Sequence, residues 1–360
     1  MPEANFDISY LYIWNSLITY TVNGVGILSA FAALSVSKSS KSRSTNVAAV
    51  LLAVILVILL GCYPIEWGYG TDRENYAVNF YRTSESISNA IVGKDSEFGF
   101  TLLNYILGRF LNVNQYFVAI AIVYICNYFI ALRRMTGKSI YWLLASVVLS
   151  MGFTSYNLNT MRAGLALSFV MLALSMYPSK FKMLVCMVAA GSIHTSALIP
   201  SAMVLISSYY SNTRLYYILW LLAVPVSFVA GNFFNTLFSG IGDDSRNSYL
   251  TGTNDHYNIG FRIDFIIYSF VPMLIGGYYI IKRKFNDSFY KVLYSAYLLT
   301  NIFWILVIRA NYSDRFAYLS WCFIPIVLVY PLLRSNVPVR SPGLWISAIL
   351  LGETIFRSLL

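Results

Sequence analysis

One arginine, Arg162, stands where a polar run meets an apolar one. The polar run is Ser155-Tyr156-Asn157-Leu158-Asn159-Thr160, and residues 163–177 carry no charge. A guanidinium at the edge of an apolar stretch is unfavourable unless it meets a partner or water. Because Ser, Asn and Thr suit a helix N-cap, and a helix N-terminus with an arginine binds anions, Arg162 is a candidate anion-binding residue, with Asn159 beside it. The alternative is an arginine that snorkels to the membrane surface.

A second candidate is His194, in the segment GSIHTSAL. Histidine accepts a proton near neutral pH, so it can act as a base toward a hydroxyl or donate to a phosphate. The alternative is a buried neutral histidine bonded to a backbone carbonyl.

A third cluster lies in IRANYSDRFAYLSW, residues 308–321. Arg315 and Tyr318 are three residues apart and share one face of a helix. Asp314 can pair with one of the two arginines, Arg309 or Arg315, and the pair would still leave net positive charge. We expect Arg309, Arg315 and Tyr318 to contact an anionic or sugar ligand.

A fourth group lies in GTDRENYAVNFYRTSE and DSEFGFTLLNYILGRF, a polar connection with carboxylates and aromatic residues. Asp72 and Glu97 are the candidate carboxylate bases. Tyr76 and Arg82 are candidate sugar- and phosphate-binding residues, because tyrosine stacks on sugar faces while its hydroxyl stays in water. Such aromatic residues can equally form a belt at the membrane surface.

The elements that must position these residues are apolar. The chain has 360 residues, of which 58% are hydrophobic and 11% charged, whereas a soluble domain carries about 25% charged residues. The mean hydropathy is +0.63. These values predict an all-α polytopic membrane protein with about 10–12 transmembrane helices. The expected crossings are roughly 10–36, 47–67, 115–132, 139–156, 162–178, 215–234, 264–281, 289–309, 315–333 and 343–360.

Charge clusters predict the orientation. The segments KSSKSR (38–43), RRMTGK (133–138), SKFK (179–182) and KRK (282–284) mark cytoplasmic loops. The N-terminus and the connections at about 68–99 and 235–263 are then outside, with an interfacial or re-entrant helix at 100–112. The N-terminal MPEANFD lacks a basic region, so we expect the first span to be retained. Residues 1–360 form a single integral membrane domain in this interpretation.

One segment leaves two interpretations open. Residues 183–208 can form one long span, or two short half-helices separated by the polar centre from Ser192 to Ser196. The second interpretation makes the number of crossings agree with the charge clusters.

Several function classes are disfavoured. The net charge of +10 comes from the loop clusters, so nucleic acid is not an expected partner. The four cysteines form no CxxC pair, the two histidines form no HExxH, and no P-loop is present. We expect no metal and no cofactor.

Four segments in this order resemble the bacterial EpsG-like/Wzy family of polysaccharide polymerases. They are DRENYAVNFY, SEFGFTLLNYI, the pair NTMRAGLAL and SIHTSALI, and DRFAYL, within residues 60–335. The resemblance implies a glycosyltransferase-C-like fold and assigns family positions to Arg162, His194, Arg315, Asp72, Tyr76 and Glu97. Two positions differ from the family pattern, where Gln often stands in place of Ala163 and Pro in place of Phe98.

The resemblance implies an O-antigen polymerase of the bacterial inner membrane, with its active site toward the periplasm. Its donor and acceptor would be undecaprenyl-diphosphate-linked oligosaccharides, and a chain-length regulator and a flippase of the same pathway are candidate partners. The alternatives are an O-antigen ligase, for which a larger outer loop is expected, and a lipid-linked oligosaccharide flippase. We expect a flippase to show charges at the centre of its spans and two pseudo-symmetric halves, and neither is apparent.

Overall fold

The described part of the chain is helical. The computed structural model describes residues 8–36, 45–85, 97–239, 261–310, 313–334, 339 and 341–359, which contain helices and turns and no strand. Six helical stretches among these residues are long and apolar enough to cross a membrane: Ser9–Ala33, Val113–Leu149, Thr213–Gly231, Ile263–Lys282, Ser288–Leu306 and Ser313–Leu333. The predicted class is confirmed, because this is an all-α polytopic membrane protein.

The chain divides into two compact units. Met1–Leu198 with Arg340–Leu360 form unit 1, and Ile199–Val339 form unit 2. The helices of unit 1 are α1 (Ile8–Ala33), α2 (Asn46–Gly61), α3 (Asp72–Glu85), α5 (Phe98–Gly108), α6 (Val113–Thr136), α7 (Ile140–Leu149), α8 (Ser155–Leu158), α9 (Met161–Ser175), α10 (Lys180–Ile193) and α18 (Pro342–Leu359), with short turns η2 (Gly137–Ser139) and η3 (Thr195–Ala197).

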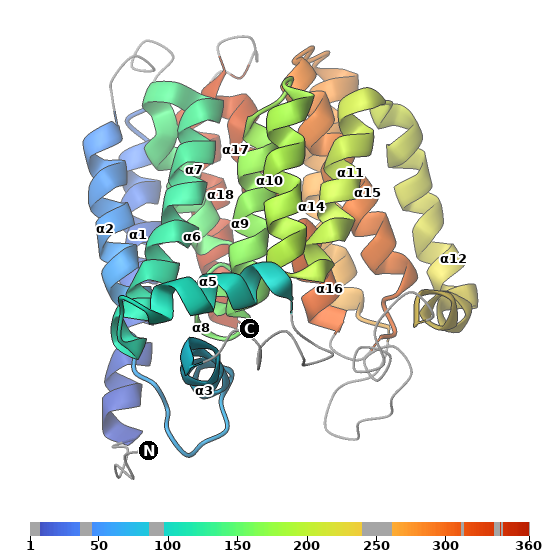
Figure 1. Cartoon of the computed structure of the whole chain (residues 1–360). Coiled ribbons are helices and arrows are strands. Elements are labelled where there is room, and N and C mark those ends of the chain that lie inside the picture. The colour runs from blue at the N-terminus through green and yellow to red at the C-terminus, as the bar shows by residue number, and fades with distance from the viewer. Residues whose placement is uncertain are drawn as a thin grey trace. The chain divides into compact units, whose positions relative to one another are not determined.

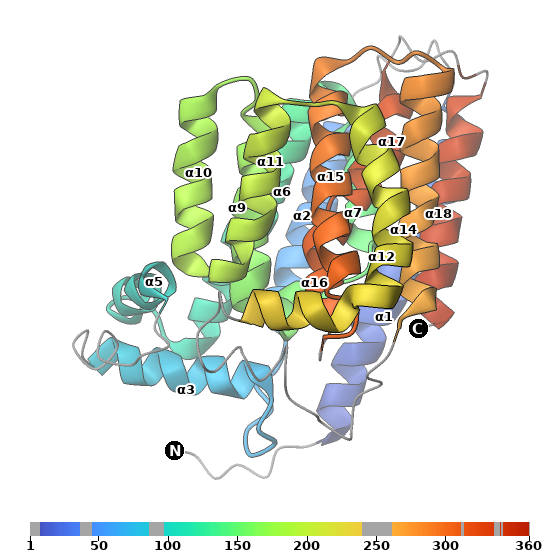
Figure 2. The same cartoon turned by 90° about the vertical axis from the view of Figure 1, so that its right-hand side faces the viewer.

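Most helices of unit 1 run side by side, and two lie across them. Figure 1 shows α1, α2, α6, α9 and α10 upright, with α5 across the lower ends of α6, α9 and α10. After a quarter turn, α3 is also seen to lie crosswise, while α5 is viewed along its axis (Figure 2). The two crosswise helices pack on each other, and α5 also packs on α10. The end of the unit that carries α3 and α5 is therefore the place where distant segments meet.

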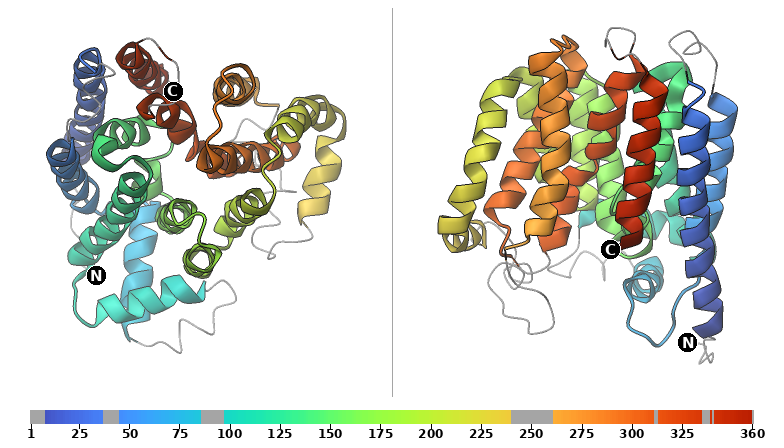
Figure 3. Two further views of the ribbon diagram at one scale, coloured as in Figure 1. Left: turned by 90° about the horizontal axis from the view of Figure 1, so that it is seen from above. Right: turned by 180° about the vertical axis from the view of Figure 1, so that it is seen from behind.

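Local sequence explains several of these packings. Helix α6 begins with a reciprocal cap, in which the Asn112 side chain accepts from Gln115 N and the Gln115 side chain accepts from Asn112 N. Helices α1 and α18 lie side by side in Figure 3, and small residues allow the approach. A Cβ atom on Gly343 would lie 2.1 Å from the Ala33 carbonyl oxygen, so this contact requires glycine.

Unit 2 contains α11 (Leu198–Tyr209, after its first residue), α12 (Thr213–Ser239), α14 (Ile263–Gly277), η4 (Tyr278–Lys282), α15 (Ser288–Leu306), α16 (Ser313–Trp321), α17 (Ile324–Val329) and η5 (Tyr330–Leu333). A buried hydrogen-bond network joins its core. Asn301 accepts from Trp220 Nε1 at 2.7 Å and donates to Ser320 Oγ at 2.8 Å and Ser269 Oγ at 3.1 Å. Satisfied buried polar groups of this kind fix one arrangement of the helices.

The observed helices refine the predicted boundaries. Helix α2 ends at Gly61 rather than near 67, and the expected span at 139–156 is α7 followed by a turn and α8. The connection at 68–99 contains a helix, α3, that the sequence analysis did not predict, and the interfacial helix expected at 100–112 is α5. Of the connection expected at 235–263, α12 takes the part up to Ser239. Residues 240–260 and the cluster at 38–43 lie outside the described residues.

Helix α18 carries a buried carboxylate. Glu353 lies within the C-terminal half of α18 and is only 6% exposed. A buried carboxylate in such a helix is retained only where neighbouring groups stabilise its charge or its proton.

Candidate functional site

The polar centre of residues 183–208 interrupts the helix. Helix α10 ends at Ile193, His194 is extended (φ −155°, ψ 124°), and the turn η3 leads into α11. The structure therefore has two short helices rather than one long one, the second of the two interpretations left open by the sequence. The break projects the His194 side chain from a helix end instead of burying it on a helix face.

A carboxylate meets this histidine. Glu97 directly precedes α5, and its side chain is 5% exposed. The Nδ1 atom of His194 lies 2.6 Å from one carboxylate oxygen and 2.8 Å from the other. The Thr195 backbone N–H donates to Glu97 Oε1 at 2.9 Å. Since a carboxylate accepts, Nδ1 is the atom that donates to Glu97, and Nε2 lies on the opposite side of the ring.

These contacts determine the charge of Glu97. Burial by itself raises the pKa of this carboxyl, but the hydrogen bond from His194, and the positive charge of that ring when it is protonated, oppose burial. The Thr195 N–H and the charge of Arg162 act in the same direction, and the pKa of Glu97 falls to about 2. Glu97 is therefore ionised at neutral pH, which suits a residue that orients His194 and disfavours it as the proton acceptor.

Arg162 is the third member of this group. It is the second residue of α9, and its Nη1 atom lies 3.6 Å from Glu97 Oε2, with the side chain 36% exposed. The guanidinium carbon lies 5.8 Å from the ring centroid of Tyr76 and 6.0 Å from that of Phe100. Its Nε atom is buried and has no hydrogen-bond partner among the described residues. We name Glu97, Arg162 and His194 the Glu–Arg–His cluster.

Two glycines allow the helices of the cluster to approach. A Cβ atom on Gly99 would lie 2.3 Å from Ser192 Oγ and 2.8 Å from the Ser192 carbonyl carbon, so the start of α5 packs directly on the end of α10. A Cβ atom on Gly164 would lie 2.1 Å from the Tyr156 carbonyl oxygen, so α8 packs directly on α9. Backbone-to-backbone contact of this kind sets the positions of Glu97 and Arg162.

Helix α3 contributes Tyr76. Its ring packs edge-on against Phe100, with ring centroids 6.0 Å apart, and faces Arg162. Burial raises the pKa of Tyr76, the positive charge of Arg162 opposes this, and the charge of Asp72 adds to it. Asp72 is exposed at the start of α3, and Arg82 is exposed near its end. Of the residues predicted on this helix, only Tyr76 lies against the Glu–Arg–His cluster.

The polar run before Arg162 differs from its expected geometry. Thr160 is the N-cap residue of α9, but its side chain makes no capping hydrogen bond. Asn159 is exposed and reaches only Ser155, at 3.5 Å. The neighbouring Asn157 is 2% exposed, and its Nδ2 atom has no hydrogen-bond partner among the described residues. Near the start of α9, it is therefore Asn157, rather than Asn159, that has a buried side-chain N–H donor without a partner among the described residues.

The residues expected from segment 308–321 lie in unit 2. Arg309 donates through Nη2 to the Phe228 carbonyl oxygen at 2.9 Å. Arg315 is exposed in the first turn of α16, and the Tyr318 ring lies on the same helix, 5.4 Å from the ring of Trp321. Their convergence with Arg162 stays a prediction. Tyr312 and the polar residues Lys94, Asp95, Asp243, Asp244, Arg246, Asp255 and His256 lie outside the described residues.

Sequence reasoning missed some of the site. Thr195, Gly99 and Phe100 lie around the cluster. For Gly99, the available sequence signal was its position two residues after Glu97. Within the described residues, no three His, Cys, Asp or Glu side chains gather as a metal site would require.

Comparison with known proteins gives the family. No curated protein matches the chain, and no solved structure matches it. The family model described as "EpsG family" matches residues 49–348, a range that includes every member of the Glu–Arg–His cluster and Arg315. The match covers most of the 360 residues. The chain belongs to the EpsG family.

Proposed function

We propose that this protein is a polysaccharide polymerase that joins lipid-linked oligosaccharide repeat units, with the Glu–Arg–His cluster at its active centre. Membership of the EpsG family supports a Wzy-like, polymerase-type role in general. The observation that carries the proposal is the meeting of Glu97, Arg162 and His194, which come from three separate segments. The three are the charged and titratable members of the segments SEFGF, NTMRAGLAL and SIHTSALI.

His194 acts as the general base in this proposal. Glu97 holds Nδ1, so Nε2 removes the proton of the acceptor sugar hydroxyl as that oxygen bonds to the anomeric carbon of the donor. The bond between the anomeric carbon and the donor phosphate oxygen breaks, and the lipid diphosphate leaves with the electron pair. The proton stays on His194 until it passes to solvent or product.

Arg162 stabilises the leaving group. A lipid diphosphate gains charge as the glycosidic bond breaks, and guanidinium donors aimed at that charge lower the barrier. Once His194 is protonated, Arg162 and His194 carry two positive charges against the one negative charge of Glu97. The excess positive charge therefore appears when the anionic product forms. Arg309 and Arg315 of unit 2 are further candidates for the diphosphate, with Tyr76 and Tyr318 for the sugars.

The proposed substrates are undecaprenyl-diphosphate-linked oligosaccharides, and the proposed place is the periplasmic face of a bacterial inner membrane. The lipid diphosphate is already an activated leaving group, so no nucleotide is required in this step. A polymerase of this kind acts beside a flippase and a chain-length regulator, which we propose as partners in the same membrane.

The test is complementation of a gene deletion in a strain whose repeat unit is known. We expect the deletion strain to carry a single repeat on its lipid A core, and the wild-type gene to restore the ladder of long chains. Loss of all repeats in the deletion strain would instead indicate a ligase or a flippase, and an unchanged ladder would refute the proposal.

Variants then locate the centre. Arg162→Ala, Arg315→Ala and His194→Ala should each insert normally and fail to restore long chains, whereas Glu85→Gln, which alters an exposed carboxylate at the end of α3, should restore them. Long chains made normally by Arg162→Ala would remove that residue from the site. Normal chains from His194→Ala would leave Asp72, Glu97 or the substrate as the base.

A further inference from the structure

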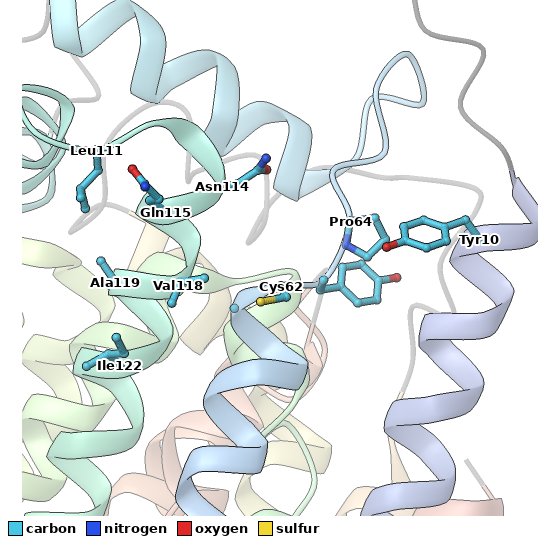
Figure 4. Close-up of a pocket in the computed structure, with 11 residues that line it drawn as sticks. Tyr10, Cys62, Pro64, Leu111, Asn114, Gln115, Val118, Ala119 and Ile122 are labelled. Atoms are coloured by element: carbon cyan, nitrogen blue, oxygen red, sulfur yellow. The ribbon is translucent and has the colours of Figure 1, made fainter.

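A hollow of about 630 Å³ opens in unit 1 (Figure 4), and no residue of the Glu–Arg–His cluster lines it. It lies between α1, the end of α2 and the start of α6. Its lining residues are Tyr10, Gly61, Cys62, Tyr63, Pro64, Leu111, Asn114, Gln115, Val118, Ala119 and Ile122. Its volume lies within the range of about 300–1,000 Å³ of small-molecule sites.

The α6 wall of the hollow is polar at one end and apolar at the other. Gln115, Val118, Ala119 and Ile122 are spaced so that they share one face of α6. Asn114 and Gln115 are exposed in the first turn of α6. Figure 4 shows them at the end of the hollow that is nearer to α3, with Ile122 at the opposite end. Ile122 is exposed within a stretch long and apolar enough to cross a membrane, so the apolar end opens toward lipid.

The polar end retains free donors. The Gln115 side-chain oxygen accepts from Asn112 N at 3.1 Å, which leaves the amide N–H groups of Gln115 for a ligand. The wall itself is rigid, because a Cβ atom on Gly61 would lie 2.9 Å from the Val118 Cα atom. A rigid apolar wall below a polar rim is the shape that a lipid with an anionic head and one long chain requires.

Helix α3 connects this hollow to the Glu–Arg–His cluster. Arg73 is 3% exposed, lies 3.9 Å from the ring centroid of Phe117, and donates to the carbonyl oxygens of Gly61 at 3.0 Å and Leu60 at 3.4 Å. Tyr76, three residues further along α3, faces Arg162. One turn of α3 therefore links a wall of the hollow to the cluster.

Arg73 also contributes charge. Burial lowers its pKa to about 10, so the guanidinium is still positive at neutral pH. A positive charge behind the wall favours an anionic head group close to the polar rim.

We infer that the hollow binds the isoprenoid chain of the lipid-linked acceptor, whose diphosphate is not cleaved and lies at the polar rim beside α3, apart from the donor diphosphate at Arg162. This inference rests on the proposed function, because it names the lipid part of the same substrate. The chain enters from the bilayer along the exposed face of α6.

Native thiols provide the test. Cys62 lines the hollow and is exposed, whereas Cys126 is exposed on α6 but does not line it. A protein with Cys126→Ser and Cys186→Ser leaves Cys62 as the accessible thiol, and one with Cys62→Ser and Cys186→Ser leaves Cys126 as the matched control. The rate of alkylation by N-ethylmaleimide is measured in detergent with undecaprenyl diphosphate, or with phosphatidylglycerol at the same mole fraction.

At about ten times its dissociation constant, undecaprenyl diphosphate should slow alkylation of Cys62 about tenfold and leave Cys126 unchanged. Unchanged alkylation of Cys62 would overturn the inference. So would equal slowing by phosphatidylglycerol, which would indicate a general lipid site, or equal slowing of Cys126, which would indicate shielding by the micelle.

Filling the hollow is the second measurement. Ala119→Trp should abolish the protection of Cys62 and raise the KM for lipid-linked substrate, whereas Ile130→Trp, at an exposed position on the same helix, should change neither. Protection that survives Ala119→Trp in a folded protein would overturn the inference.

Protection is a binding readout and needs no turnover, so it should persist in His194→Ala. The two proposals can thus fail separately. Polymer made by His194→Ala would remove the proposed base without affecting protection, and unprotected Cys62 in an active enzyme would remove only the hollow.

Discussion

Glu97 places a negative charge where almost no water reaches it. That carboxylate accepts hydrogen bonds from the His194 ring and the Thr195 N–H, and it pairs with the positive charge of Arg162. A buried carboxylate with such partners is stable, but removing one partner leaves the others unsatisfied. The cluster therefore responds as a unit, and substitutions within it should not be additive.

The charge of Glu97 gives a pH-dependent stability. Its pKa of about 2 lies below the ordinary carboxyl value of 4.5, and a shift of this size corresponds to on the order of 3 kcal/mol. Because the folded pKa is depressed, this stabilisation is complete above about pH 4.5 and is lost as the pH falls toward 2.

Glu97→Gln should therefore unfold at a lower temperature than the wild type at pH 7 and pH 5, with a smaller gap at pH 3. Thermal unfolding in detergent measures this, with Glu85→Gln as the control. A gap that stays constant down to pH 3 would show that the charge of Glu97 is not the source of the stabilisation.

The sequence identified the chemistry of these residues better than their roles. Arg162 was predicted because a charge beside an apolar run is costly, His194 because histidine accepts a proton near neutral pH, and Glu97 because it is a carboxylate in a polar connection near the membrane surface. Glu97 was predicted as a base alongside Asp72, but its partners hold it ionised. The carboxylate that forms a hydrogen bond with His194 is determined by the position of α5. The local sequence around His194 does not give that position.

At the scale of elements, each member of the cluster stands at a helix end. Glu97 precedes α5, Arg162 is the second residue of α9, and His194 follows α10. Helix ends leave backbone N–H and C=O groups without partners in the helix, so polar side chains are tolerated there at membrane depth. The contact of Gly99 with Ser192 brings two of these ends together.

Gly99→Ala tests this contact. The added methyl group would meet the Ser192 carbonyl carbon, and because that atom belongs to the backbone, α5 and α10 must move apart. We expect about 1–3 kcal/mol of destabilisation, and a loss of chain extension as Glu97 moves from His194. Thermal unfolding and the length of the glycan ladder are the measurements.

Gly24→Ala is the matched control, since nothing lies within 4 Å of a Cβ atom at Gly24 in α1. There alanine should stabilise the helix slightly. An active, stable Gly99→Ala protein would show that the approach of α5 to α10 can relax without cost.

The elements also show where sequence patterns were insufficient. Helix α3 was missed because its mean hydropathy is low and its apolar residues are few. It packs on α5 through aromatic residues such as Tyr76 and on α2 through Arg73, contacts that no periodicity along one segment reveals. The long spans were predictable, because about 20 apolar residues are needed to cross a bilayer. The crossings expected at 47–67 and 162–178 correspond instead to the shorter helices α2 and α9.

At the scale of the whole molecule, orientation in the membrane follows from the charge clusters. The loop at 133–138 is proposed to be cytoplasmic, and α3 and α5 periplasmic. A cysteine introduced at the exposed Tyr69, before α3, should react with a membrane-impermeant maleimide in intact spheroplasts. A cysteine at Lys138 should react only after lysis, in both cases on a background without Cys62 and Cys126. The reverse pattern would place the cluster toward the cytoplasm and contradict the periplasmic proposal.

Helices α9 and α10 are short for a membrane protein. They contain 15 and 14 residues, so each spans roughly 22 Å, whereas the hydrocarbon core of a bilayer is about 30 Å thick. A bilayer beside short helices thins to match them. Head groups next to Arg162 would then dip toward the protein, and polymerisation should be faster in vesicles of short-chain lipids than in vesicles of long-chain lipids. Lipid composition would in this way tune the proposed polymerisation without any change in the residues of the protein.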